Sequence, residues 1–380
     1  MEMNFIKKYA ITRMLRYASH QSDENIIRMI DIANKYFIKS EKVRWEAEKI
    51  RRIFVEHQPG AQLAKNTFSR ISKQSLDCVI QNFFINAAVI GHQRQEQLRK
   101  ELNISLPWFF VISPTARCNL TCVGCYAGNY SKQEDLSFEL VDRIFNEAKD
   151  LGIYFVTVSG GEPFMWPHLL DIMEKHHDMF FQIYTNGTLI TKDVANRLGK
   201  LGNAAPAISI EGFEKETDAR RGEGTFKRIM EAMDNLRNAG VPFGFSATPT
   251  KLNIETLMSD EFIDLMIEKG CSIGWFFQYV PIGRKPDVSL MATPEQRFRL
   301  RRRSIEIRNT KPIFIGDFWN DGPYVGGCIC GARQGGYFHI NCHGDVEPCV
   351  FLQFSVDNIK DKKLIDVIQS PFFKAFQDAQ

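Results

Sequence analysis

The feature that most limits the fold is an alternation of strand-like and helix-like segments that begins at Pro107. Six short apolar runs follow one another, with helical segments near 137–151, 192–200, 225–239 and 254–269 between them. Such alternation is typical of a parallel sheet with helices on its outer side. Six units are too few for a closed eight-stranded barrel, so we expect an α/β fold built as an open, partial (β/α)6 barrel. The six runs are WFFVIS, IYFVTVS, FFQIYTNG, AAPAISIEG, VPFGFSATPT and SIGWFFQYVP.

The same patterns divide the chain into three expected regions. Residues 1–105 have apolar positions at helical spacing and form an N-terminal all-helical region, in which Ser72 caps one helix and Pro59 ends another. Residues 106–310 form the partial barrel. Residues 311–380 form a small Cys-rich C-terminal extension, whose weak apolar periodicity indicates that its four cysteines staple it.

The charge of the chain is small overall but unevenly distributed. A net charge of +3 does not indicate a nucleic-acid-binding protein. Residues 1–105 hold 18 Lys and Arg against 11 Asp and Glu, a local +7 that leaves −4 for the rest. That basic region is either a solvated helical surface or a surface for an acidic partner or an anionic membrane.

The expected location follows from the apolar runs. None reaches the roughly 20 residues that cross a membrane, and no signal-peptide pattern follows the start, so we expect a cytoplasmic protein. The basic, amphipathic segment from Met3 to Tyr17 is the candidate for peripheral contact with the inner membrane face.

A cysteine trio lies just after the first expected strand. Cys118, Cys122 and Cys125 are spaced C-x3-C-x2-C. In a cytoplasmic chain, nine cysteines are ligands or buried thiols rather than disulfides, and the apolar surroundings of Cys78 and Cys271 favour buried thiols. Three thiolates can hold three irons of a [4Fe–4S] cluster and leave the fourth iron open. The trio alone also permits a zinc site with a distant fourth ligand.

A second motif, VSGGEP, ends the second expected strand. Gly160 and Gly161 leave backbone groups accessible, and Glu162 and Pro163 set the turn that follows. Parallel α/β folds place ligands at the carboxyl ends of their strands. The trio and this turn therefore point to one site on neighbouring strand ends.

With these motifs, residues 107–290 resemble the radical S-adenosylmethionine (SAM) superfamily. The resemblance implies that Cys118, Cys122 and Cys125 hold a [4Fe–4S] cluster whose open iron is chelated by SAM. In that family an aromatic residue usually precedes the third cysteine. Here that residue is Gly124, so the contact on the adenine side is expected from Tyr126.

The resemblance also implies a set of SAM-binding residues at the strand ends. The motifs TNGT at 185–188 and SIEG at 209–212 end the third and fourth strands, and YVPIG at 279–283 resembles the family's adenine-binding segment after the sixth strand. In ARRGEGTF, one of two arginines is expected to pair with the SAM carboxylate, the alternative being a surface pair at a helix entry. The full expected set is Gly160, Gly161, Glu162, Pro163, Thr185, Asn186, Ser209, Glu211, Arg220, Arg221, Tyr126 and Pro281.

The tail contains a second cysteine pattern, C-x-C-x11-C-x6-C. Four thiolates suit an Fe–S cluster or a zinc site. The tail is similar to the SPASM and Twitch extensions of radical SAM enzymes, which implies one auxiliary Fe–S cluster. His339 and His343 flank the cysteines and are interpreted as structural. The expected ligands are Cys328, Cys330, Cys342 and Cys349.

Together the resemblance implies a radical SAM oxidoreductase or modifying enzyme. An electron from reduced flavodoxin or ferredoxin reaches the cluster, which cleaves SAM to a 5′-deoxyadenosyl radical, and that radical abstracts hydrogen from an unactivated C–H bond. The expected substrate is a peptide or protein. One alternative is a lipid acyl chain, favoured by the basic first helix and by 30 phenylalanines. An alternative of another class is a non-catalytic Fe–S protein for electron transfer or structure.

Overall fold

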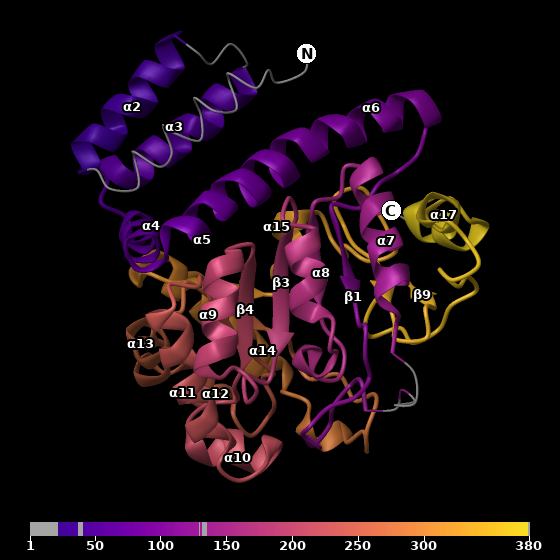
Figure 1. Ribbon diagram of the computed structural model, residues 1–380. Coiled ribbons are helices and arrows are strands. Elements are labelled where there is room, and N and C mark those ends of the chain that lie inside the picture. The colour runs from indigo at the N-terminus through magenta and orange to yellow at the C-terminus, as the bar shows by residue number, and fades with distance from the viewer. Residues whose placement is uncertain (1–21, 37–40, 129, 131–134, 379–380) are drawn as a thin grey trace.

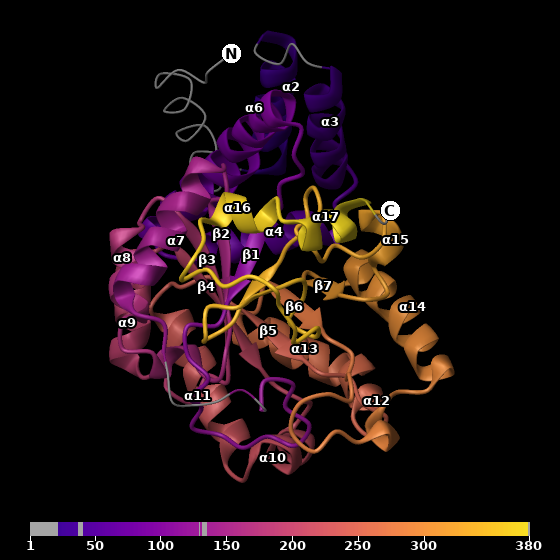
Figure 2. The same ribbon diagram turned by 90° about the vertical axis from the view of Figure 1, so that its right-hand side faces the viewer.

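The computed structural model describes residues 22–36, 41–128, 130 and 135–378. A curved parallel sheet with helices on its outer side forms the body of the molecule, and the N-terminal helices lie across one end (Figure 1). The Cys-rich tail lies along the open edge of the sheet (Figure 2). The expected α/β partial barrel is confirmed. The segment from Met3 to Tyr17 lies outside the described residues.

In the described part of the chain, nine strands form one sheet in the order β7-β6-β5-β4-β3-β2-β1-β8-β9. Strands β1 to β7 are parallel, which confirms the six expected strands and adds a seventh beyond residue 310. β8 pairs with β1, and β9 returns antiparallel to β8, so the tail extends the barrel sheet at its first strand. The strands are β1 (Phe109–Ile112), β2 (Phe155–Val158), β3 (Phe180–Thr185), β4 (Ala204–Ser209), β5 (Gly244–Ala247), β6 (Ile273–Phe276), β7 (Phe314–Asp317), β8 (His339–Ile340) and β9 (Val346–Glu347).

Helices follow the strands in turn and cover the outer face of the sheet. The helix expected at 254–269 is two helices, because Ser259 has an extended backbone and its hydroxyl caps the second by accepting from Phe262 N at 3.2 Å. The helices are α7 (Phe138–Asp150), η2 (Pro163–Met165), α8 (Leu169–Lys175), α9 (Lys192–Leu201), α10 (Glu214–Arg221), α11 (Thr225–Asn238), α12 (Ile254–Met258), α13 (Asp260–Lys269), η3 (Val288–Leu290), α14 (Pro294–Thr310), α15 (Gly322–Val325), α16 (Leu364–Ile368) and α17 (Pro371–Asp378).

The two faces of the sheet differ in burial. On β3, Phe181 and Ile183 are fully buried beneath the helices, whereas the alternate residue Tyr184 is half-buried. Tyr184 contacts the ring of Phe277 at 5.4 Å between centroids, although β4 and β5 lie between their strands. This contact therefore crosses the barrel interior. Trp275 and Phe277 are likewise half-buried on the inner face, so the interpretation of this stretch as core holds only for Phe276.

The N-terminal helices close the amino end of the barrel. Phe83 packs its ring against Trp108, Phe155 and Phe180, with centroids 5.5–5.8 Å apart. Because Phe155 and Phe180 begin β2 and β3, this contact lies at the end opposite the cysteine trio. The helices are α2 (Asp23–Tyr36), α3 (Glu41–Val55), α4 (Pro59–Arg70), α5 (Lys73–Cys78), the π-helix η1 (Val79–Gly91) and α6 (His92–Leu102).

Two local expectations for this region can be compared with the structure. Ser72 caps α5 as expected, because its hydroxyl accepts from Ser75 N at 3.1 Å. Pro59 was expected to end a helix, but α3 ends at Val55 and Pro59 is the first residue of α4, where its missing N–H costs nothing. None of the described helices combines the length and the apolar character that crossing a membrane requires.

Candidate cofactor site

The cysteine loop, residues 113–128, runs from the end of β1 across the carboxyl edge of the sheet (Figure 2). Cys118, Cys122 and Cys125 are free, half-buried thiols. Burial raises the pKa of Cys118, which indicates that its thiolate needs a counter-charge or a metal. The loop thus presents three potential ligands at the edge where parallel sheets bind cofactors.

The glycine turn, residues 160–163, holds this loop through the backbone. Gly161 N donates to Thr115 O at 2.9 Å, and Glu162 N donates to Arg117 O at 2.8 Å. A Cβ on Gly161 would lie 2.2 Å from Arg117 O, and one on Gly160 would lie 2.4 Å from Thr115 O. The glycines are therefore needed for close approach to the cysteine loop, and the Gly161 N–H is already used there.

Glu162 joins the ends of β2 and β3. Its buried carboxylate accepts from Thr185 Oγ1 at 2.7 Å, Asn186 N at 2.8 Å and Phe164 N at 3.2 Å. Burial raises the pKa of Glu162, and these hydrogen bonds oppose that shift. Pro163 begins the short helix η2 directly after it. Glu162 therefore fixes the glycine turn to the end of the third strand.

Asn186 carries this connection back to the cysteine loop. Its side-chain Nδ2 donates to Asn119 Oδ1 at 2.8 Å and lies 3.9 Å from Cys118 Sγ. Asn119 in turn donates to Thr188 Oγ1 at 2.8 Å. The structure thus brings the glycine turn, the TNGT motif and the first cysteine together as expected.

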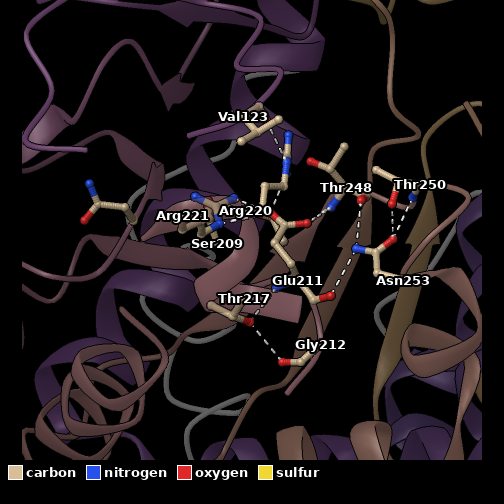
Figure 3. A network of polar contacts seen from close by, with 12 residues as sticks. Val123, Ser209, Glu211, Gly212, Thr217, Arg220, Arg221, Thr248, Thr250 and Asn253 are labelled. Atoms are coloured by element: carbon tan, nitrogen blue, oxygen red, sulfur yellow. Dashed lines mark hydrogen bonds and ion pairs between the residues drawn. The ribbon is translucent and has the colours of Figure 1, made fainter. Parts of the chain in front are cut away.

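The end of β4 carries a buried charge cluster (Figure 3). Glu211 is fully buried, and one of its carboxylate oxygens binds both Arg220 and Arg221. Its other oxygen accepts from Thr248 N at 3.1 Å. Neither arginine lies free at a helix entry, so the surface-pair alternative is wrong. One carboxylate against two guanidinium groups leaves one positive charge in the cluster.

That surplus charge faces the cysteine loop. Arg220 Nε donates to Val123 O at 3.3 Å, and Val123 N donates to Arg220 O at 3.0 Å. Burial alone would lower the pKa of Arg221, but Glu211 and the thiols of Cys122 and Cys125 raise it above its ordinary value. A cation held this close to two thiols favours their thiolate forms, which bind iron.

Tyr126 and Ser209 are the other expected residues near the loop. Tyr126 Oη hydrogen bonds to Ser159 Oγ at 2.8 Å, and burial raises the pKa of Tyr126 to about 12. Its ring packs on Phe351 of the tail, so it joins the barrel to the extension. Ser209, at the end of β4, is half-buried, and its Oγ lies 3.2 Å from Ser246 Oγ on β5.

The segment after β6 contacts the cysteine loop more closely than the sequence suggested. Arg284 N donates to Cys125 O at 2.9 Å, and a Cβ on Gly283 would lie 2.2 Å from the same oxygen. Gly124 has φ +64°, and a Cβ there would lie 2.6 Å from Tyr279. Gly124 thus makes room for Tyr279, which explains why no aromatic precedes Cys125. In the sequence, only the glycines at 124 and 283 could have indicated that the two segments approach each other so closely.

A cavity of about 150 Å³ opens beside this segment. Pro281, expected on the adenine side of SAM, lies in its wall. The cavity is polar at Gln278 and Arg297 and otherwise apolar, as ligand sites usually are. Its lining residues are Gln278, Tyr279, Val280, Pro281, Met291, Ala292, Arg297 and Trp319.

Three of the four tail cysteines lie around Tyr337. The Sγ atoms of Cys328 and Cys330 are 3.3 Å apart, and Cys349 Sγ is 2.9 Å from Tyr337 Oη. All three thiols act on the pKa of Tyr337, which burial raises well above its ordinary value. Cys342 instead faces Asp135, Asp345 and Glu347. Three of the four expected ligands therefore lie around Tyr337, and Cys342 shares the neighbour Glu347 with Cys349.

Sequence reasoning treated His339 only as structural and missed the buried chain that it joins. His339 Nε2 lies 2.8 Å from Ser113 Oγ, and its Nδ1 lies 2.7 Å from Glu347 Oε2. Glu347 also accepts from Tyr130 Oη at 2.8 Å and from Asn341 Nδ2 at 2.9 Å. This series of hydrogen-bonded side chains connects the start of the cysteine loop with the tail, and no motif spacing in the sequence indicates it.

The donor set around the cysteine loop fits a cluster. Among the residues that the structure describes, no three Cys, His, Asp or Glu side chains converge as the ligands of one metal ion do. The thiolates of a [4Fe–4S] cluster bind different irons, so they need not converge on one point. Three thiols, one uncompensated guanidinium and a side-chain amide next to Cys118 match that arrangement.

Of the other thiols, Cys271 is buried as expected, and Cys78 is only half-buried.

Comparison with protein families gives two matches. The model of the radical SAM superfamily matches residues 112–266. The SPASM model, described as an iron–sulfur cluster-binding domain, matches residues 328–380. The matched ranges contain the cysteine loop and the tail cysteines, respectively.

Curated relatives and solved structures agree with these matches. The mycofactocin maturase MftC of Mycolicibacterium smegmatis is 30% identical over 273 residues, which cover 67% of this chain and 67% of the relative. The AdoMet-dependent heme synthase of Methanosarcina barkeri is 32% identical over 176 residues, 45% of this chain and 50% of the relative. Streptococcus suis SuiB bound to S-adenosylmethionine has a TM-score of 0.63 at 21% identity, covering 75% of this chain and 71% of SuiB. SuiB with its precursor peptide SuiA gives 0.62 at 20%, covering 76% and 71%.

Proposed function

Since this chain belongs to the radical SAM superfamily, we propose that it modifies a peptide or protein by removing hydrogen from an unactivated C–H bond. It is an enzyme whose cofactors are a [4Fe–4S] cluster and SAM, with further Fe–S binding in its SPASM domain. When bound, the cluster and SAM supply the one-electron chemistry of that step. The proposal concerns the substrate and the residues that serve it.

The observation that carries the proposal is the cysteine loop itself. Three thiols lie at the carboxyl edge of the sheet, and the glycine turn fixes their loop through two backbone hydrogen bonds. We assign Cys118, Cys122 and Cys125 as the cluster ligands. Arg221 would stabilise their thiolate forms, and Asn186 would donate to Cys118 Sγ. Glu162 and Glu211 would act as positioning residues, because their carboxylates are already used by protein donors.

The inner face of the barrel is the proposed place of the substrate. Tyr184, Trp275 and Phe277 are half-buried there and present aromatic surface next to the strand ends. Aromatic walls exclude water and bind apolar side chains of a substrate. The N-terminal helices close the opposite end, so a substrate would enter from the side of the cysteine loop.

A peptide substrate is favoured by the relatives. MftC is named a maturase, and SuiB is described in complex with a precursor peptide. The lipid alternative depended on the phenylalanine content and on the segment from Met3 to Tyr17, which lies outside the described residues. The non-catalytic alternative has no use for a loop that leaves one iron without a protein ligand.

Two experiments test the proposal in turn. Anaerobically reconstituted protein, reduced with dithionite, should release 5′-deoxyadenosine from SAM. Mass spectrometry of peptides from cells with and without the protein should then reveal a peptide whose mass changes by loss of hydrogen. Release of 5′-deoxyadenosine without any changed peptide, but with a changed lipid, would replace the peptide proposal by the lipid one.

A further inference from the structure

Positive charge is concentrated in the segment that follows the sixth strand. Residues 281–310 hold eight Lys and Arg against three Asp and Glu. Part of this charge is compensated, because Arg299 pairs with Glu255, Arg303 with Asp260 and Arg308 with Asp321. These pairs fix α14 to its neighbours and leave the other basic residues of the segment unmatched.

Four of these unmatched residues, together with Lys251, form what we call the basic face. In the part of the chain that the structure describes, none of its members makes an ion pair. Glu255 and Glu306, which are close in sequence to members of this face, pair with Arg299 and Arg303, and Asp287 caps η3 by accepting from Ser289 N at 2.8 Å. The basic face therefore carries a clear excess of positive charge. Its members are Lys251, Arg284, Lys285, Arg297 and Arg301, whereas Arg302 lies on another side of α14.

These residues gather around the loop at 281–293. Lys251 N donates to Leu290 O at 2.9 Å, and Gln296 Nε2 donates to Lys251 O at 3.2 Å, which brings Lys251 to the start of α14. Arg297 and Arg301 are one helical turn apart and share a side of α14. The basic face is thus one surface built from two loops and a helix.

The basic face adjoins the cysteine loop. Arg284 N donates to Cys125 O at 2.9 Å, and Arg284 Cβ lies 2.5 Å from the position of a Cβ on Gly128. Figure 2 draws the loop that precedes α14 beside the cysteine loop at the same end of the barrel. One hydrogen bond therefore separates the backbone of the basic face from a proposed cluster ligand.

We propose that the basic face is the docking surface of an acidic one-electron carrier protein, such as flavodoxin or ferredoxin. The inference rests on the proposed function, because that reaction consumes one electron from outside the chain. In the step, the carrier loses one electron and the [4Fe–4S] cluster gains it, with no bond or proton exchanged. Unmatched charge beside the cysteine loop would attract an acidic carrier, and docking there would keep the path to a cluster held by Cys125 short.

The test uses the full chain with two exposed residues of the basic face reversed together, Lys251→Glu and Lys285→Glu. The control variant carries the same charge change on α9 and α11, Lys200→Glu and Lys227→Glu, which are also exposed. Binding of oxidised flavodoxin is measured by calorimetry at low and high salt, and 5′-deoxyadenosine release is measured with reduced flavodoxin and with dithionite.

The basic-face variant should bind flavodoxin about tenfold more weakly at low salt, and the difference from wild type should shrink at high salt. Its flavodoxin-driven 5′-deoxyadenosine release should fall, while its dithionite-driven release stays at the wild-type level. Equal weakening in the control variant would overturn the inference, because net charge alone would then explain the effect. Normal flavodoxin binding with lost substrate turnover would also overturn it and assign the face to the substrate. A wild type that fails with dithionite would contradict the proposed function, whereas the binding comparison would still test the docking surface.

Discussion

Substitution of Gly161 by Ala tests how the site is built, because it changes one methyl group and no charge. The new Cβ would lie 2.2 Å from Arg117 O and 2.6 Å from Ala116 O. Ordinary contacts begin at 3.4 Å, so the cysteine loop must retreat by about 1.2 Å, the difference between 3.4 and 2.2 Å. Gly161 has no left-handed φ, so the strain comes from this contact alone.

The size of the effect follows from what the retreat breaks. Overpacking a tight contact costs about 1–3 kcal/mol. Weakening the hydrogen bonds of Gly161 N and Glu162 N costs about 0.5–1.5 kcal/mol each. The variant should therefore be less stable by roughly 2–6 kcal/mol, with the loss concentrated at the cysteine loop. A displacement of about 1 Å at a reacting centre can reduce a rate by about a hundredfold.

The assay compares Gly161→Ala with Gly322→Ala, where the nearest atom to the added Cβ is 3.9 Å away. After anaerobic reconstitution, iron per chain, the thermal midpoint of the apoprotein and dithionite-driven release of 5′-deoxyadenosine are measured for both. Gly161→Ala should lower the midpoint by several degrees and the release about a hundredfold, and it should retain iron in the tail. Equal rates of 5′-deoxyadenosine release in the two variants would refute the argument that the glycine turn positions the cysteine loop.

Three further predictions concern the cysteines. Replacing Cys118, Cys122 and Cys125 together by Ala should abolish 5′-deoxyadenosine release and leave iron in the tail, while the wild type approaches about eight irons per chain, roughly two clusters of four; release at the wild-type rate would show that the cluster is elsewhere. Cys349→Ala should remove the tail iron, whereas Cys78→Ala should retain it, since the Cys78 thiol instead lies 3.5 Å from Leu201 O; equal iron loss from both variants would mean that the tail thiols are not its ligands. In the apoprotein, the hydrogen bond with Cys330 lowers the pKa of Cys328 to about 5, whereas burial raises the pKa of Cys271. At neutral pH Cys328 is therefore a thiolate and Cys271 a thiol, so iodoacetamide should label Cys328 first, and lowering the pH from alkaline to neutral should not slow that labelling. Peptide mapping that finds both thiols labelled at similar rates would contradict this order.

Much of the fold was predictable because the relevant signals are local. Strands such as FFQIYT and helices such as 225–239 are recognised from the spacing of neighbouring apolar residues, and the structure has them as β3 and α11. The break at Ser259 was missed because its cap forms through a hydrogen bond that apolar spacing does not reveal. The boundary expected at residue 310 stays a prediction, and β7 continues the sheet beyond it.

The site was predictable in kind but less so in detail. The trio at 118–125 and the glycine turn indicated a cluster because their spacing lies within single loops. The pairing of Glu211 with two arginines, and the contact of Arg284 with Cys125, join residues whose distance in sequence carries no signal. The assignments of cluster and SAM ligands remain proposals that the variants above test.

The sequence by itself thus determined the order of strands and helices and the residue types that each strand end carries, because periodicity and motif spacing depend on neighbours along the chain. Only the tertiary structure decided which of those strand ends meet. It placed Arg221 near Cys122 and Cys125, gathered Cys328, Cys330 and Cys349 around Tyr337, and set the basic face beside the cysteine loop. The physical reason is that contacts between distant segments depend on the curvature of the sheet and the packing of its loops, which no short stretch of sequence contains.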